Sequence, residues 1–120
     1  MSYVDGFLLA VPKKNLAAYR SIAKKAGKVW MEYGALAYME CAADDVPKGK
    51  KTSFPMSVKL KPNEIVVFSY IVYKSRGDRN RINKKVMSDP RLADMMTPKA
   101  MPFDATRMIF GGFKTIVELG

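Results

Sequence analysis

The sequence predicts one α+β domain in which two helices cover one face of a four-stranded antiparallel sheet. Segments with strand and helix patterns follow one another in the order strand, helix, strand, strand, helix, strand. The stretch Glu64 to Tyr73 is β-branched and aromatic on both alternating faces, which is typical of a central strand covered twice. A chain of 120 residues is long enough for one ordinary core, so we expect a single domain over residues 1–120.

The first third of the chain is expected to form a strand, a helix and a second strand. Residues 4–11 are an apolar run that Pro12 helps to end. Asn15 is expected to cap a helix that runs to about Tyr33, because apolar residues recur at steps of three and four, and Gly34 is expected to end it. The apolar run 35–43 predicts the second strand.

The segment from Asp44 to Asn63 is long for a hairpin loop, which usually takes 2 to 5 residues. Phe54 and Val58, four apart, are expected to anchor a short helix or turn against the edge of the sheet. The strand 64–73 follows. Long loops of this kind often carry function, although a structured insertion is an equal alternative.

Two helices are predicted after the central strand. Ser75 with Asp78 three residues later resembles a capping box, and the apolar stripe behind it continues to about Ser88. Asp89 followed by Pro90 predicts a second, short helix. Its expected inward residues are Leu92, Met95 and Met96.

The chain is expected to close with a loop and a last strand. Residues 97–106 contain two prolines and predict the loop, and residues 107–119 predict the strand. Gly111 and Gly112 interrupt the strand pattern, which indicates a bulge or a close backbone approach.

This order is that of a split βαβ, or ferredoxin-like, βαββαβ sandwich, in which the first and third strands are central. One sheet face then remains apolar and uncovered. It could pack against a second copy to form a dimeric α/β barrel, or its aromatic Phe68 and Tyr70 could stack on RNA bases. The basic and glycine-flanked aromatic pattern of RNA-binding strands is absent, so we favour a homodimer through the sheet face.

Composition restricts the chemistry. The chain has no histidine and a single cysteine, which excludes the common Ser-His and Cys-His nucleophile pairs and the usual zinc and iron ligand sets. We therefore expect no metal site, and any catalysis must use carboxylates, tyrosine, lysine, arginine or a bound cofactor. No cofactor is indicated by a motif, and none is expected. Cys41 lies in an apolar strand pattern and is expected to be a buried, inert thiol.

Charge and hydropathy bear on partners and location. The net charge of +10 would suit nucleic acid, with basic clusters at 48–51 and 76–85. The remaining lysines are spread along helical faces, so nucleic acid is kept as an alternative partner only. The sequence has neither an apolar run of about 18 residues nor a signal-peptide pattern, and we expect a cytoplasmic protein without membrane contact.

Distinctive motifs are spread over nearly the whole chain: Tyr3-Val4-Asp5-Gly6-Phe7, the run from Glu40-Cys41 to Lys48-Gly49-Lys50, Val67-Phe68-Ser69, Met87-Ser88-Asp89-Pro90-Arg91, Met101-Pro102-Phe103-Asp104, and Arg107 to Phe113. Together they resemble the YbaA-like family, a bacterial family of small proteins of unknown function. The resemblance implies the dimeric α/β-barrel fold and no particular activity. Relatives at the superfamily level include cofactor-free monooxygenases and isomerases, which is an analogy of fold.

The candidate catalytic residues are Asp5, Glu40 and Arg107. Asp5 and Glu40 could be paired carboxylates beside the sheet, one kept protonated by burial, with Arg107 orienting an anionic substrate. Alternatively, Arg107 neutralises a strand carboxylate and Asp104 caps a turn together with other aspartates.

Candidate ligand contacts are Tyr38, Tyr70 and Asp104, although such tyrosines are more often core or interface residues. The methionines of the second half would either fill gaps in the core or line an adaptable cavity. The favoured function is binding of a small organic molecule beside the sheet, with or without cofactor-free catalysis. A basic RNA- or DNA-binding module and a structural dimer without catalysis are the alternatives.

Overall fold

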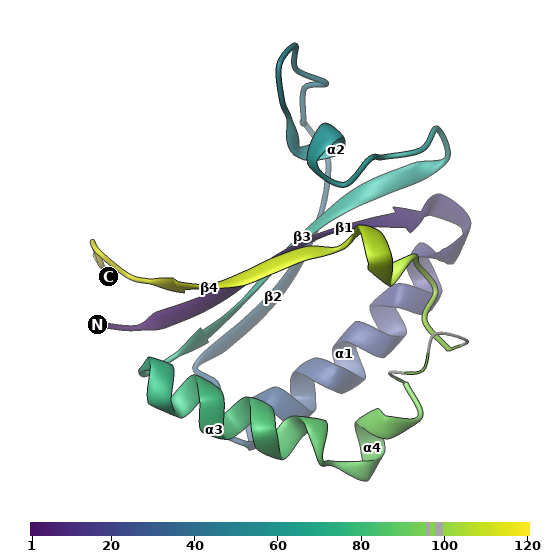
Figure 1. Cartoon of the computed structure of the whole chain (residues 1–120). Helices are drawn as coiled ribbons and strands as arrows, with labels where there is room; N and C mark the ends of the chain where they lie inside the picture. Colours follow the sequence, from purple (N-terminus) through teal and green to yellow (C-terminus); the bar gives the residue numbers. More distant parts are fainter. Residues whose placement is uncertain (96, 98–99) are drawn as a thin grey trace.

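The computed structural model describes residues 1–95, 97 and 100–120 (Figure 1). Its elements are β1 (Tyr3–Pro12), a 3₁₀ turn (Lys13–Asn15), α1 (Leu16–Glu32), β2 (Ala37–Ala42), α2 (Phe54–Ser57), β3 (Glu64–Tyr73), α3 (Arg76–Met87), α4 (Pro90–Ala93), a second 3₁₀ turn (Ala105–Arg107) and β4 (Ile109–Lys114). The central strand has the bounds that the sequence predicts. The inward position expected for Met96 lies outside the described residues.

The four strands form one antiparallel sheet in the order β2-β3-β1-β4. The first and third strands are therefore central, as predicted. Figure 1 shows α1 and α3 on one face of the sheet and α2 on the other. The predicted α+β sandwich with a four-stranded antiparallel sheet is confirmed.

The face of β3 that carries Val67, Ile71 and Tyr73 points toward the helices and is buried. Ile71 and Tyr73 pack in one cluster with apolar residues of α1, α3 and α4, and Ile82 of α3 is fully buried in it. Each fully buried aliphatic side chain contributes about 1.5–3 kcal/mol, so this cluster is what attaches the helices to the sheet.

Local capping explains most helix boundaries. The Ser75 hydroxyl accepts a hydrogen bond from the Asp78 amide at 3.1 Å, as the predicted capping box requires, and the Asp89 carboxylate accepts one from the Arg91 amide. Gly34 has a φ of 114°, which suits glycine after a helix end. Asn15 is the residue before α1, as predicted, but its side chain does not cap the helix and donates instead to the Pro102 carbonyl oxygen at 3.0 Å.

The other face of the sheet is covered only at one end. There Val58, just after α2, is buried against Ala10 and Val66. The predicted short helix is present, but it lies over the central strands and not at the sheet edge, and Phe54 is 49% exposed. Elsewhere the face stays open, with exposed fractions of 63% for Phe113, 48% for Met39, 45% for Ile109 and 43% for Phe68. Cys41 lies on this side and is exposed, so the prediction of a buried thiol is wrong for the single chain.

The last strand is shorter than predicted and runs without interruption through Gly111 and Gly112. Arg107 belongs to the preceding 3₁₀ turn, and residues 115–120 are outside the strand. Of the two structures predicted for the glycine pair, the close approach is correct. A Cβ on Gly112 would lie 2.4 Å from both the Tyr3 hydroxyl and Nη2 of Arg79, which cross the strand at this point.

Candidate functional site

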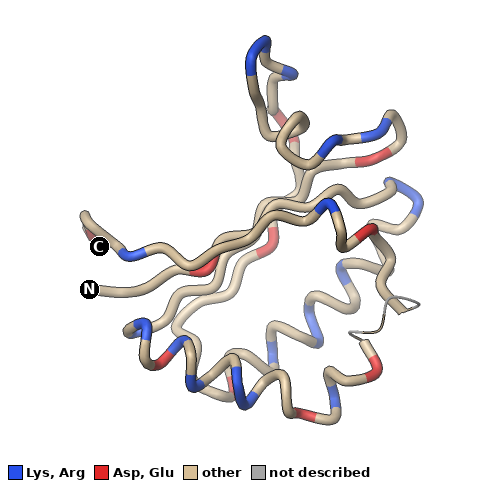
Figure 2. Tube along the Cα trace, in the orientation of Figure 1, with Lys and Arg blue, Asp and Glu red and all other residues tan. Residues whose placement is uncertain are grey.

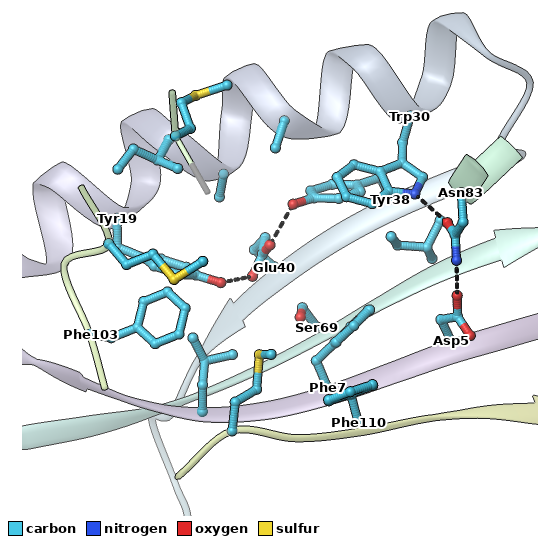
Figure 3. Close-up of a pocket in the computed structure, with 18 of the residues that line it drawn as sticks. Asp5, Phe7, Tyr19, Trp30, Tyr38, Glu40, Ser69, Asn83, Phe103 and Phe110 are labelled. Carbon is cyan, nitrogen blue, oxygen red and sulfur yellow. Dashed lines mark hydrogen bonds between the residues drawn. The ribbon is translucent and has the colours of Figure 1, made fainter. Parts of the chain in front are cut away.

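A cavity of about 520 Å³ lies between the helix-facing side of the sheet and the helices α1 and α3 (Figure 3). Its wall is mainly apolar, with aromatic rings from both layers and methionines from α3 and the segment after α4. Volumes of 300–1,000 Å³ are usual for sites that bind small molecules. The polar groups in this wall come mainly from two clusters, one around Glu40 and one around Asp5.

Glu40 of β2 is half-buried and accepts a hydrogen bond on each carboxylate oxygen. The Tyr19 hydroxyl donates to Oε1 at 2.7 Å and the Tyr38 hydroxyl donates to Oε2 at 2.6 Å (Figure 3). Burial first, and then the charge of Glu40, raises the pKa of both tyrosines above the ordinary value of 10.0. Both hydroxyls therefore keep their protons at neutral pH and act as donors.

Strand and helix geometry places these three groups together. Tyr38 and Glu40 are two apart on β2, so both side chains point toward the helices, while Tyr19 reaches them from α1. Gly27 of α1 leaves room for the Tyr38 ring, because a Cβ there would come within 2.7 Å of two ring carbons. The ring of Trp30 lies 6.1 Å from that of Tyr38 and closes this side.

The second cluster is centred on Asp5, whose side chain is 7% exposed. Nε of Arg79 donates to its two carboxylate oxygens at 3.0 and 3.2 Å, and the Asn83 amide donates at 3.4 Å. The Asn83 carbonyl in turn accepts from the Trp30 indole and the Tyr73 hydroxyl, each at 3.0 Å. This network satisfies its members and neutralises Asp5 with a guanidinium, which is the arrangement expected of a structural polar cluster.

The structure brings some predicted site residues together and separates others. Asp5, Glu40 and Tyr38 line the cavity, but the two carboxylates do not pair, because each has its own partners. Figure 3 shows Glu40 between the tyrosines and Asp5 beside Asn83.

Arg107 lies away from the cavity and binds Glu64, with Nη1 of Arg107 2.7 Å from Oε1 of Glu64. Asp104 caps the 3₁₀ turn through Thr106 and also pairs with Arg107. Arg107 thus neutralises a strand carboxylate and Asp104 caps a turn, which are the roles given above as the alternative. The position of Arg107 does not support its use in orienting a substrate in this cavity. Tyr70 lies on the open face, where its hydroxyl donates to the Met39 sulfur at 3.2 Å.

Sequence reasoning missed Tyr19, Arg79, Asn83 and Ser69 as site residues. Tyr19 belongs to the apolar stripe of α1 and looks like a core residue, and Arg79 looks like one member of a basic cluster. Ser69 is a small hydroxyl residue among the large apolar residues of the inward face of β3, and that contrast is a signal a sequence reading can use. Its side chain lines the cavity beside Glu40, its register partner on β2 (Figure 3).

The described residues also bear on metal binding and on membrane insertion. Within residues 1–95, 97 and 100–120, no group of three or more His, Cys, Asp or Glu side chains is arranged to hold a metal ion. In the same part of the chain, the helices are too short or too polar to cross a membrane.

The fold and the cavity define a small α+β sandwich protein with a carboxylate placed in an aromatic pocket. The chain belongs to the family described as "Protein of unknown function (DUF1428)", whose model matches residues 2–105. It is 51% identical over 118 residues to the uncharacterized protein YbaA of Escherichia coli strain K12 and, equally, to that of Shigella flexneri. The match covers 98% of this chain and 99% of each relative, and it confirms the resemblance seen in the sequence.

Among solved structures, the chain is similar to an uncharacterized NIPSNAP domain protein from Burkholderia xenovorans. The TM-score is 0.60 at 12% sequence identity, and the alignment covers 98% of both chains. At this identity the likeness shows the fold alone.

Proposed function

We propose that this protein binds a small organic molecule in the cavity between the sheet and the helices. The observation that carries the proposal is the Glu40 cluster: a carboxylate held by two tyrosine hydroxyls in an otherwise apolar wall. A carboxylate in such a wall costs desolvation energy that packing alone does not recover. A few oriented polar groups in an apolar cavity are what ligand sites generally use for orientation and specificity.

The same groups can move protons without a cofactor, so catalysis of the cofactor-free kind belongs to this proposal. Glu40 can accept a proton from a bound molecule, and the neighbouring Ser69 hydroxyl can orient the reacting group. Tyr19 and Tyr38 would hold the carboxylate in place during the transfer. A structural role for the cluster is the alternative, and it requires no ligand at all.

A fragment screen tests the binding proposal. We expect fragments that raise the melting temperature of the parent protein to lose this effect in Ala26→Leu, because Ala26 lines the cavity and a larger side chain fills it. Ala18→Leu is the matched control, since Ala18 is an exposed alanine on the same helix. Fragments that bind Ala26→Leu as well as the parent would place their site elsewhere and refute the proposal.

A second copy of this chain is the partner we propose for the open face of the sheet. Phe68, Ile109 and Phe113 form a shallow apolar surface with Gly6 and Leu8, and solvent exposure of such a surface is unfavourable. A two-fold pairing would cover the same residues on both copies. Light scattering at micromolar concentration should give a dimer, and Phe68→Lys should shift it to a monomer. A monomeric parent would remove this part of the proposal.

Nucleic-acid binding is the competing function. Figure 2 shows Lys and Arg along α1 and α3, and Arg20, Lys24 and Lys28 are exposed at steps of four on α1. This charge lies on the helices, whereas Phe68 and Tyr70 lie on the open face of the sheet, so the stacking platform and the helical charge are on opposite sides. Salt-dependent binding to generic single-stranded RNA would favour this alternative over the cavity.

A further inference from the structure

The charge balance of the cavity indicates what kind of molecule occupies it. Asp5 is neutralised by Arg79 within the wall. The ion pairs formed by the described residues do not include Glu40, whose hydrogen-bond partners are the two tyrosine hydroxyls. Glu40 therefore brings a carboxylate into the cavity that no cation of the described residues balances.

Each oxygen of Glu40 accepts a hydrogen bond from a tyrosine hydroxyl, at 2.7 Å from Tyr19 and at 2.6 Å from Tyr38. Both oxygens thus serve as acceptors, and a carboxylate oxygen has a further lone pair for a donor in the cavity.

The remaining wall suits a cation as well. Six aromatic side chains line the cavity: Phe7, Tyr19, Trp30, Tyr38, Phe103 and Phe110. Ring faces carry partial negative charge and attract ammonium groups, with the largest effect where water is excluded. The Glu40 carboxylate and the aromatic rings thus both favour a positively charged ligand.

Arg79, a cation in the described part of the cavity wall, does not reverse the preference for a positively charged ligand. Nε of Arg79 is bound to Asp5 and Nη1 donates to the Asn80 side chain at 2.8 Å. Arg79 is therefore already paired with an anion, and the described residues that line the cavity carry a net negative charge in a protein whose total is +10. The preference for a cation arises inside the cavity and against the charge of the whole molecule.

We infer that the occupant of this cavity is an organic cation, a protonated amine or a quaternary ammonium on an apolar body, whose charged group meets Glu40. This inference rests on the proposed binding function and adds its ligand class. A neutral ligand would leave the carboxylate unbalanced, and an anionic one would be repelled by it.

The test uses compounds that share one ring system and differ in one group: 2-naphthylmethylamine, 2-naphthylmethanol and 2-naphthoate. Titration calorimetry should show the amine binding at least about tenfold more tightly than the alcohol, with the carboxylate weakest. In Glu40→Gln the amine and the alcohol should bind with similar affinity. Glu32→Gln is the matched control, because Glu32 lies on the exposed end of α1.

A second variant tests whether any disturbance of the Glu40 cluster abolishes the preference for the amine. Tyr19→Phe removes one hydroxyl and keeps the carboxylate, so it should retain the preference for the amine. Equal binding of amine and alcohol by the parent, or a preference that survives in Glu40→Gln, overturns the inference and leaves the proposed function standing. If no compound of the series binds, the inference also fails. The proposed function fails with it only when the fragment screen yields no molecule that Ala26→Leu excludes.

Discussion

The ion pair between Glu64 and Arg107 makes a quantitative prediction about stability and pH. Glu64 begins β3 and Arg107 ends the 3₁₀ turn before β4, so the pair connects two segments far apart in sequence. The side chains are 7% and 13% exposed, and the guanidinium contacts both carboxylate oxygens. Arg107→Gln removes the charge and leaves Glu64 partly buried without its partner.

The size of the effect follows from the pKa of Glu64. Hydrogen bonding to Arg107 lowers it from 4.5 to about 2, although burial acts in the opposite direction. A shift of this size corresponds to about 3 kcal/mol of preference for the ionised form in the folded protein. Because the pair lies at the rim of the sheet, where solvent weakens it, we expect Arg107→Gln to lower the free energy of unfolding by about 2 kcal/mol at pH 7.

Urea denaturation over a pH series measures this difference. The folded pKa of Glu64 is depressed, so the stabilisation is complete above its unfolded value of 4.5 and is lost as pH falls toward 2. The gap between parent and Arg107→Gln should therefore be largest near pH 7 and close by about pH 2. A gap below about 0.5 kcal/mol at pH 7, or one that does not shrink in acid, would refute this reasoning.

A double-mutant cycle separates the pair from other contacts of Arg107. Its guanidinium also donates to the Lys59 carbonyl at 3.0 Å and binds Asp104. Glu64→Gln leaves both contacts in place, so the coupling energy between the two substitutions reports the ion pair alone. A coupling near zero would assign the loss to those other contacts.

Three further substitutions test the packing around the cavity and the core. Gly27→Ala should destabilise by about 1–2 kcal/mol despite the better helix propensity of alanine, because its Cβ meets the Tyr38 ring at 2.7 Å; a more stable variant in urea denaturation would contradict this. Ile82→Ala should cost about 2–5 kcal/mol, since the side chain is fully buried, and a loss below about 1 kcal/mol would be inconsistent with that burial. Gly112→Ala should lower the melting temperature by several degrees more than Gly111→Ala, because a Cβ at Gly111 meets only ordinary contacts; equal effects would disprove the close approach.

Local patterns were enough for much of the architecture. The doubly apolar run that became β3 was placed at its correct bounds, and Ser75 and Gly34 marked helix ends through their own backbone contacts. The last strand was predicted too long, because residues 115–119 continue the apolar pattern although the pairing with β1 stops at Lys114. An apolar pattern shows that a segment can form a strand, but the length of the partner strand decides where pairing ends.

The candidate site was only partly accessible from sequence. Asp5 and Glu40 stood out as carboxylates in apolar strands, and both line the cavity. Arg107 was expected beside them on the basis of its charge, whereas the fold pairs it with Glu64, a residue 43 positions away. Which arginine neutralises which carboxylate depends on distances across the sheet, and a sequence contains none of those distances.

The sequence by itself determined the order of the elements, because that order follows from hydrophobic periodicity and capping within short segments. The order, as that of a split βαβ fold, in turn implied the two central strands and two helices on one face of the sheet. Only the tertiary structure decided that Tyr19 of α1 and Tyr38 of β2 meet on Glu40, and that Arg79 of α3 satisfies Asp5. These contacts join residues of different elements, and side-chain hydrogen bonds form wherever packing brings a donor within about 3 Å of an acceptor. The position of the Glu40 carboxylate in the cavity, held by two hydroxyls, is a product of that packing.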